Sequence, residues 1–243
     1  MPLKRRLDLL VVERGLADSR EKAQALIMAG LVLVDDQPAT KAGANVADGA
    51  VVRLKAGGLA YVSRGGLKIE GAIAHFGLEV RGTICADVGC STGGFTHYLL
   101  LNGATRIYGI DVDVTQLDWR LQSDPRVIKV QRNARFLEFG DIGELVDLVT
   151  MDASFISLTM LLAPASGILK PGGHCLALVK PQFEVGREKV GKGGIVKSER
   201  DQVESVEKIM RAGEQLGLGC VGSCESPITG KEGNREFFVL FKK

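Results

Sequence analysis

Strand-like and helix-like patterns alternate from Leu67 to the C-terminus, and this alternation restricts the fold more than any other feature of the chain. Short apolar runs typical of buried strands lie at 84–88, 106–111, 127–131, 145–152, 175–180, 220–223 and 236–241. Helical patterns lie at 67–76, 94–102, 114–121, 157–169 and 199–216. Such alternation predicts an α/β domain, with a mostly parallel sheet and helices on both faces. The last two strands follow each other without an obvious helix, so we expect them to form an edge hairpin.

The first 55 residues have a different pattern. We expect one helix over Leu7–Val12 that closes near Gly15. Residues 18–21, Asp-Ser-Arg-Glu, have the spacing of a capping box, which predicts a second helix that ends at Gly30. Two strands and a turn between elements are expected at 31–34, 51–54 and 35–38, respectively.

These patterns predict two domains of unequal size. Two helices and a few short strands form a small α+β module, and a glycine-rich stretch separates it from the alternating part. The expected division is a first domain at 1–55, a linker at 56–66 and an α/β domain at 67–243.

Glycine is unusually common, at 31 of 243 residues, or about 13% against a typical level of roughly 7%. This excess indicates tight turns and close backbone approaches, which are frequent in α/β proteins with nucleotide-binding loops. The formal net charge is only +2. The charge therefore excludes a polybasic protein, but a local basic face that binds nucleic acid stays compatible with it.

Neither a membrane protein nor a metal site is expected. The apolar stretch 158–169 is broken by Pro164 and is shorter than the roughly 20 residues that a span requires. The acids Asp8 and Glu13 interrupt the apolar stretch that a signal peptide would need. Five cysteines without a C-x-x-C pair and three scattered histidines favour a reduced protein of the cytoplasm.

The clearest chemical signal is the glycine-rich segment 87–95, Asp-Val-Gly-Cys-Ser-Thr-Gly-Gly-Phe, between the first strand of the α/β domain and a helix. Alone it also fits a structural turn, and it lacks the Lys-Ser or Lys-Thr of a phosphate loop. However, Asp111 ends the second strand, where a carboxylate can bind ribose hydroxyls, and Asn133-Ala134 closes the third. Three such features at successive strand ends predict a cofactor that contains adenosine.

Both NAD and S-adenosylmethionine fit this outline, and the loop distinguishes them. Its sequence D-V-G-x-S-x-G-G-F resembles the S-adenosylmethionine motif of Rossmann-like methyltransferases, whereas Gly89-Cys90-Ser91 lacks the second glycine of a dinucleotide fingerprint. We therefore predict S-adenosylmethionine. The expected contacts are Asp87, Gly89, Ser91, Gly93, Gly94, Phe95, Asp111, Val112, Asn133 and Ala134.

Four charged residues lie at positions that a helical or strand core does not require. Lys68 begins a helix, Asp152 and Lys180 end the fourth and fifth strands, and Glu236 begins the last strand. Lysine at the end of a buried strand is costly unless it is paired, and these strand ends face the ligand crevice. Taken singly, each of the four is equally compatible with an ordinary surface charge.

Residues 67–243 resemble an FtsJ-type methyltransferase, and the whole chain resembles the TlyA (haemolysin A) family of ribosomal RNA 2′-O-methyltransferases. The first domain resembles an RNA-binding module also found in a small-subunit ribosomal protein and in pseudouridine synthases. The motifs that carry the resemblance are Arg5-Arg6-Leu7-Asp8, Ser19-Arg20-Glu21-Lys22-Ala23, Ile27-Met28-Ala29-Gly30, Gln116-Leu117-Asp118-Trp119-Arg120 and Asp152-Ala153-Ser154-Phe155-Ile156-Ser157. The resemblance implies a Rossmann-like sheet that uses S-adenosylmethionine to methylate the ribose of a cytidine in ribosomal RNA or ribosomal subunits.

The resemblance also implies the roles of the charged residues. A Lys-Asp-Lys-Glu tetrad surrounds the ribose hydroxyl in this family, and Lys68, Asp152, Lys180 and Glu236 match it. Two roles stay open for Lys180: a general base with a lowered pKa, or a charged group that orients the hydroxyl.

Two further segments are expected to contact RNA. Arg5, Arg6, Arg20 and Lys22 form a candidate phosphate-binding face in the first domain. Residues 186–194 are rich in glycine and lysine, so we expect a mobile segment that closes over the target nucleotide.

The alternatives to this function are methylation of another RNA such as tRNA, a membrane-binding cytolysin, and an RNA-binding protein without catalysis.

Overall fold

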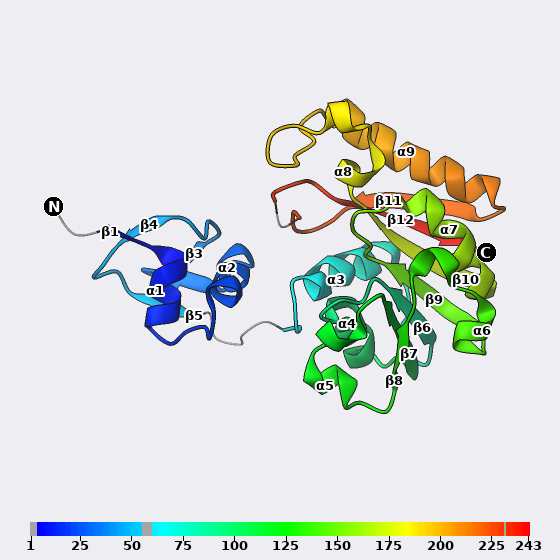
Figure 1. Cartoon of the computed structure of the whole chain (residues 1–243), viewed down its shortest axis with the longest axis horizontal. Helices are drawn as coiled ribbons and strands as arrows, with labels where there is room; N and C mark the ends of the chain where they lie inside the picture. Colours follow the sequence, from blue (N-terminus) through cyan, green and yellow to red (C-terminus); the bar gives the residue numbers. More distant parts are fainter. Residues whose placement is uncertain (1–3, 55–59, 231) are drawn as a thin grey trace. The chain divides into compact units, whose positions relative to one another are not determined.

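The computed structural model describes residues 4–54, 60–230 and 232–243 (Figure 1). The chain divides into two compact units, Met1–Arg64 and Gly65–Lys243. The proposed linker at 56–66 falls partly on 56–59, which lie outside the described residues, so its assignment stays a prediction.

The first unit packs two helices against short antiparallel strands. The apolar faces of the helices, with Leu7, Leu10 and Ile27, share one buried core with Val32 and Val52. The helices are α1 (Leu7–Glu13) and α2 (Arg20–Met28). The strands are β1 (Lys4–Arg6), β2 (Val32–Val34), β3 (Gln37–Ala39), β4 (Asn45–Ala47) and β5 (Val52–Leu54), in the sheets β1-β4 and β3-β2-β5.

Two details of the first unit differ from the sequence prediction. Ser19, not Asp18, caps α2, because its side chain accepts a hydrogen bond from the Lys22 backbone N–H at 3.2 Å. The turn is confined to Asp35 and Asp36, both with positive φ, while Gln37–Ala39 already pairs with β2. A turn of two residues with positive φ suits a tight hairpin, so a strand, β3, begins within the segment expected to be a turn.

The second unit is built around a seven-stranded sheet with the order β11-β12-β10-β9-β6-β7-β8. Its strands are β6 (Ile84–Val88), β7 (Arg106–Asp111), β8 (Val127–Gln131), β9 (Val146–Met151), β10 (Leu169–Val179), β11 (Gly219–Glu225) and β12 (Phe237–Lys242). Neighbouring strands from β8 to β10 are parallel, and β12 pairs antiparallel with both β10 and β11. This arrangement confirms the α/β fold and the edge hairpin.

Helices cover both faces of this sheet, with α3 and α4 on one side and α7 and α9 on the other (Figure 1). The core beneath α7 and α9 takes alternate strand residues, such as Val149, Met151 and Ala177. The α-helices are α3 (Gly65–Phe76), α4 (Gly94–Leu101), α5 (Trp119–Gln122), α6 (Phe139–Ile142), α7 (Leu162–Ile168), α8 (Pro181–Glu184) and α9 (Glu199–Gln215). The 3-10 helices are η1 (Val114–Gln116), η2 (Ala134–Phe136), η3 (Leu158–Met160) and η4 (Arg187–Lys189).

Two predicted helices are interrupted. The helix expected at 114–121 is split into η1 and α5, because the Asp118 side chain accepts the Arg120 backbone N–H and starts a new helix. The helix expected at 157–169 is split into η3 and α7 and stops one residue early, since Leu169 already pairs with Val146 and begins β10.

Candidate active site

The glycine-rich loop after β6 has a backbone that requires its glycines. Gly89 has a φ of +83°, and a Cβ atom there would lie 2.7 Å from the Asp152 carbonyl oxygen. Gly93 has a φ of +91°, and a Cβ atom would lie 2.3 Å from Cδ1 of Leu121. Neither position can accept a side chain without displacing its neighbours. The loop therefore passes close to the end of β9 before α4 begins.

The carboxylate of Asp87 is hydrogen-bonded to the first turn of α4, directly after this loop. Its Oδ2 accepts hydrogen bonds from the backbone N–H of Thr96 at 2.9 Å and from the Thr96 hydroxyl at 2.6 Å, and its Oδ1 accepts one from Thr150 at 3.1 Å. The residue is 0% exposed. Burial raises the pKa of Asp87 to about 6, against the opposing effect of the threonine hydrogen bonds.

A cavity of about 530 Å³ opens at the carboxyl ends of the parallel strands. Six of the predicted cofactor contacts line it: Gly89, Ser91, Asp111, Val112, Asn133 and Ala134. The other four, Asp87, Gly93, Gly94 and Phe95, lie outside its lining. Phe95 is buried and packs on Phe238 at a ring-centroid distance of 6.1 Å, so it serves the core beneath the loop.

Asp111 has the position expected of a ribose-binding carboxylate. Its Oδ2 accepts the backbone N–H of Ser91 at 2.9 Å, and its Oδ1 accepts that of Asp113 at 3.2 Å. A carboxylate has about four acceptor sites, so two stay available to hydroxyl groups in the cavity. The apolar side chains of Ile110, Ala134 and Leu161 also line the cavity and suit a purine ring. The residues present therefore fit S-adenosylmethionine.

The four tetrad residues form two buried ion pairs. Lys68 Nζ lies 2.6 Å from Oε2 of Glu236, and Lys180 Nζ lies 2.6 Å from Oδ1 of Asp152. Lys180 also donates to the Ser154 hydroxyl at 2.9 Å. Lys68, Lys180 and Glu236 are 9%, 8% and 3% exposed, respectively. Ordinary surface charges are not buried in this way, so the alternative that these residues are surface charges is wrong.

The two ion pairs are close enough to interact. Burial favours the protonated form of Asp152, but the charges of Lys180 and Lys68 outweigh it and hold the pKa of Asp152 below its ordinary value. Asp152 is therefore a carboxylate at neutral pH. Because Asp152 lines the cavity, the tetrad lies directly beside the candidate cofactor site.

Sheet topology explains how residues so distant in sequence meet. Asp152 and Lys180 follow β9 and β10, which are parallel neighbours, so both lie at the same edge of the sheet. Glu236 directly precedes β12, whose first residue Phe237 pairs with Val179. Because β12 is antiparallel to β10, its beginning lies at the end where Lys180 follows.

Sequence reasoning assigned no role to Phe155, which is the most exposed large hydrophobic residue described. It is 91% exposed, has a φ of +64° and lies 5.2 Å from the ring of Phe183. A bulky residue in this backbone region is strained, and such strain clusters at functional sites. An aromatic residue three positions after Asp152 was the available signal.

The candidate phosphate-binding face of the first unit is organised by a buried acid. Asp8 accepts hydrogen bonds from Arg6 at 3.0 and 2.9 Å, from Arg20 at 3.0 Å and from Gln24 at 3.0 Å. The bonds from Arg6, then those from Gln24 and Arg20, outweigh burial and lower the pKa of Asp8. The Arg6 and Arg20 side chains are half-exposed, so each presents part of its guanidinium to solvent.

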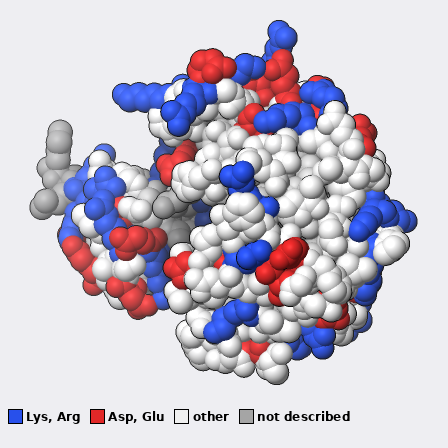
Figure 2. All heavy atoms as spheres, turned by 45° about the vertical axis from the view of Figure 1, so that its right-hand side comes forward, with Lys and Arg blue, Asp and Glu red and all other residues white. Residues whose placement is uncertain are grey.

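The other two candidate residues also have acidic partners. Arg5 pairs with Glu13 and, at 3.4 Å, with Asp48. Lys22 pairs with Asp18 at 2.5 Å. Figure 2 shows basic and acidic side chains intermixed on the visible face of this unit. Phosphate binding by the four residues stays a prediction.

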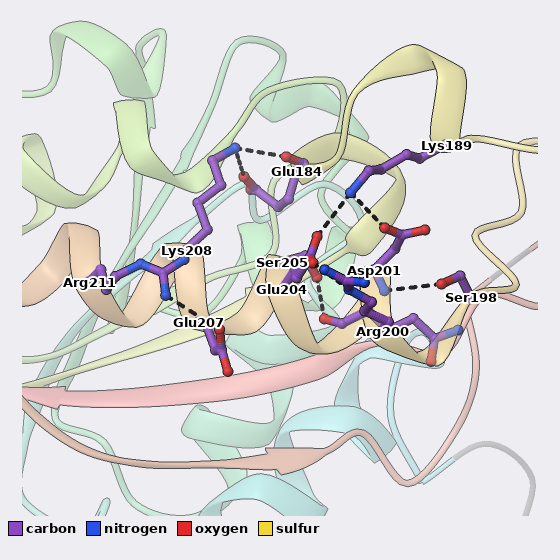
Figure 3. Close-up of polar contacts among 11 residues, drawn as sticks. Glu184, Lys189, Ser198, Arg200, Asp201, Glu204, Ser205, Glu207, Lys208 and Arg211 are labelled. Carbon is purple, nitrogen blue, oxygen red and sulfur yellow. Dashed lines mark hydrogen bonds and ion pairs between the residues drawn. The ribbon is translucent and has the colours of Figure 1, made fainter.

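Ion pairs of one lysine join the segment 186–194 to α9. Lys189 pairs with Asp201 at 2.6 Å and with Glu204 at 2.9 Å (Figure 3). The backbone N–H of Gly191 donates to Ile195 at 2.9 Å. Closure of this segment over a nucleotide stays a prediction.

The described ranges, 4–54, 60–230 and 232–243, contain neither a candidate metal centre nor a candidate membrane span. No group of three or more His, Cys, Asp or Glu side chains there could hold a metal ion. No helix in those ranges combines the length and apolar character needed to cross a membrane.

Comparison with known proteins agrees with this geometry. The FtsJ-like methyltransferase family matches residues 61–243, and the S4 domain matches residues 5–52. The chain belongs to the FtsJ-like methyltransferase family. The 16S/23S rRNA (cytidine-2′-O)-methyltransferase TlyA of Mycobacterium tuberculosis is 43% identical to it over 244 residues, which cover 100% of this chain and 91% of that protein. The expected TlyA family membership is thereby confirmed.

Solved structures give the same result for the fold. The structure named "Putative hemolysin" from Streptococcus thermophilus has 42% identity and a TM-score of 0.77, and the match covers 100% of this chain and 89% of that one. An S-adenosylmethionine dependent methyltransferase from Mesorhizobium loti has 16% identity and a TM-score of 0.54, over 71% of this chain and 96% of that one. The latter likeness concerns the fold alone, and it confirms the Rossmann-like sheet.

Proposed function

We propose that this protein transfers a methyl group from S-adenosylmethionine to the 2′-hydroxyl of a cytidine ribose in ribosomal RNA. The observation that carries the proposal is the pair of buried ion pairs, Lys68–Glu236 and Lys180–Asp152, beside the cavity at the strand ends. The relative TlyA, 43% identical over the full chain, supports ribosomal RNA and cytidine as the substrate. Ribosomes also point to the cytoplasm as the place of action.

S-adenosylmethionine would be held by the residues that line the cavity. Asp111 would accept hydrogen bonds from the ribose hydroxyls, and Asn133 and Ala134 lie where the adenine edge is expected. When bound, the cofactor supplies an electrophilic methyl group on a positively charged sulfur. The protein has to bring a single hydroxyl oxygen into line with that methyl group, and such positioning alone accounts for much of a rate enhancement.

Lys180 is the group that orients the hydroxyl in this proposal. An ammonium has three N–H bonds, and two of those of Lys180 are directed to Asp152 and Ser154. The third is available to the ribose oxygen, where it stabilises the alkoxide that remains after the hydroxyl proton has passed to water. The negative charge on that oxygen is neutralised as it takes the methyl group. Lys68, held by Glu236, adds a second positive charge to the same site.

The RNA would be held by both units. The arginines around Asp8 suit phosphates, and the exposed ring of Phe155 suits stacking with an unpaired base. Loop nucleotides with splayed bases are the usual targets of sequence-specific RNA recognition. The substrate expected is therefore a single-stranded or loop region of ribosomal RNA.

Two measurements test the function. Methyl-labelled S-adenosylmethionine and purified protein are incubated with ribosomal subunits from cells that lack the gene, and the product is mapped by mass spectrometry. We expect 2′-O-methylcytidine in ribosomal RNA. An RNA fragment with 2′-deoxyribose at the mapped position has no nucleophile, so it should accept no label. Label on that fragment, or on a base atom, would contradict the proposal.

A further inference from the structure

Glu184, the last residue of α8, is a buried carboxylate that the chemistry above does not use. Its side chain is 1% exposed. Oε1 accepts the backbone N–H of Leu158 at 2.7 Å, and Oε2 accepts the hydroxyl of Ser157 at 2.6 Å. The ammonium of Lys208 on α9 lies 3.0 Å from Oε2 and also donates to the Glu184 carbonyl oxygen at 2.8 Å (Figure 3).

The contacts of Glu184 hold the far end of the loop that carries Asp152. The near end of this loop is fixed because the Asp152 N–H donates to the Val88 carbonyl oxygen at 3.0 Å. Lys180 then contacts Asp152 and Ser154, and Glu184 contacts Ser157 and the next residue. One short segment, 180–184, therefore holds both ends of the loop 152–157.

The loop between these two attachments is under strain. Phe155 has a φ of +64° and its ring is almost fully exposed, so little packing fixes it. A non-glycine residue in this conformation is strained and persists only where its surroundings determine it. The hydrogen bonds of Glu184 and the Phe183 ring, which both belong to α8, supply those surroundings.

Stability alone is a poor reason for such an arrangement. A buried ion pair often contributes little to folding, because desolvation offsets the attraction between its charges. It does determine geometry, since neither oxygen of Glu184 can leave its donors without losing a buried hydrogen bond. The loop that Glu184 fixes also lines the cofactor cavity through Ala153, Ser154 and Phe155.

We infer that Glu184, with Lys208 as its counter-charge, is a positioning residue for methyl transfer. It fixes the loop 152–157 against Lys180, and thereby sets the positions of Asp152 and Phe155. The inference rests on the proposed function, because the loop matters to catalysis only if the tetrad acts on the ribose.

The test uses the full-length protein and a charge rescue. Lys208→Met leaves the Glu184 carboxylate buried without its cation, so we expect about a 10- to 100-fold loss of the methyl-transfer rate from misplacement of the loop. Combining it with Glu184→Gln removes the unpaired charge and keeps an oxygen for the Leu158 N–H, so most of the rate should return. Arg211→Met is the matched control, since Arg211 lies on the same helix and pairs only with exposed Glu207 among the contacts described. It should change the rate less than twofold.

Hydrogen exchange of residues 153–158 gives a second readout that does not need activity. Lys208→Met should increase exchange in this segment at least tenfold, and the double variant should restore protection. Unchanged exchange in Lys208→Met, or a rate loss that Glu184→Gln does not repair, would overturn the inference. Absence of methyl transfer by the wild-type protein would instead reject the proposed function, and exchange would then decide whether Glu184 fixes the loop.

Discussion

The Nζ atom of Lys180 lies 2.6 Å from Oδ1 of Asp152, and this contact joins the ends of two neighbouring parallel strands. Both strands are buried in the centre of the sheet. The two charges are therefore positioned by buried strands of the sheet before any substrate arrives. Groups that are fixed in this way need no rearrangement at the moment of reaction, which is what makes electrostatic stabilisation effective.

Replacement of Lys180 should separate its two possible roles. We expect Lys180→Met to lower the single-turnover rate by about 100- to 1,000-fold, the usual cost of removing a charge-stabilising donor. Lys180→Arg keeps a charged donor that cannot act as a base, so measurable transfer should remain. Lys170→Met is a suitable control, because Lys170 lies on β10, the strand that Lys180 follows, and pairs with Asp147 at 2.7 Å. Equal loss in the Met and Arg variants would favour the general-base role.

The four tetrad residues should behave as one unit. Lys68→Ala and Lys180→Ala should each be severe, and the double variant should be little worse than either, because removal of one member disables the site for the others. Single-turnover rates of the three variants test this. Losses that multiply would indicate independent roles.

Asp111→Ala should weaken S-adenosylmethionine binding by about 1.5–3 kcal/mol, the typical contribution of hydrogen bonds to a charged group. Part of this loss would come from the loop, because Asp111 also accepts the Ser91 N–H. Asp113→Ala is the control for loss of a side-chain hydrogen bond to a backbone N–H. Asp113 caps η1 by accepting the Thr115 N–H at 3.0 Å, and it does not line the cavity. Calorimetry that gives equal affinities for wild type and a folded Asp111→Ala would remove Asp111 from the site.

The sequence predicts the sheet well because buried parallel strands are continuous apolar runs. The bounds of β6 and β7 agree with prediction for this reason, and those of the edge strand β8 agree as well. Asp111 ends β7 as predicted, whereas Asp152 directly follows β9. The strands β1 and β4 were missed, because Lys4–Arg6 has no apolar alternation and pairs only through tertiary contact. Local propensity contains no information of that kind.

Sequence reasoning named the four charged residues that the structure brings together in pairs, but it could not predict their geometry, and their catalytic roles stay predictions. The register that aligns Phe237 with Val179 is a property of the assembled sheet, so the pairing of Lys68 with Glu236 and of Lys180 with Asp152 could not be derived from spacing. For Asp87, the sequence motif did not reveal the direction of the side chain. Its place in the motif indicated a ligand contact, whereas its carboxylate points to Thr96 and Thr150 in the interior.

The buried carboxylate of Asp87 should make stability depend on pH. Its folded-state pKa of about 6 lies above the ordinary value of 3.8, so between these values the native state binds a proton that the unfolded state has released. Stability contributed by this group is therefore lost as pH rises, by about 1 kcal/mol between pH 5 and pH 7. Asp87→Asn should lack this component. Urea unfolding monitored by circular dichroism would show it as a difference between the two proteins that changes with pH. A constant difference would contradict the assigned pKa.

The RNA-binding face of the first unit allows a test in which charge and orientation predict opposite signs. Asp8→Asn removes a negative charge beneath Arg6 and Arg20, so a purely electrostatic face should bind ribosomal RNA more tightly. If Asp8 instead holds the two guanidinium groups in a geometry that matches phosphates, binding should weaken, and we expect a 3- to 10-fold increase in Kd.

Arg5→Ala with Arg20→Ala should reduce the slope of log K against log salt by about 1.4–1.8, since each lost phosphate contact contributes about 0.7–0.9. Arg53→Ala should leave the slope unchanged, because Arg53 lies on β5, outside the candidate face, and pairs with exposed Asp36 in the turn before β3. Circular dichroism of each variant checks folding. Tighter binding by a folded Asp8→Asn protein would show that orientation by Asp8 does not contribute to RNA recognition.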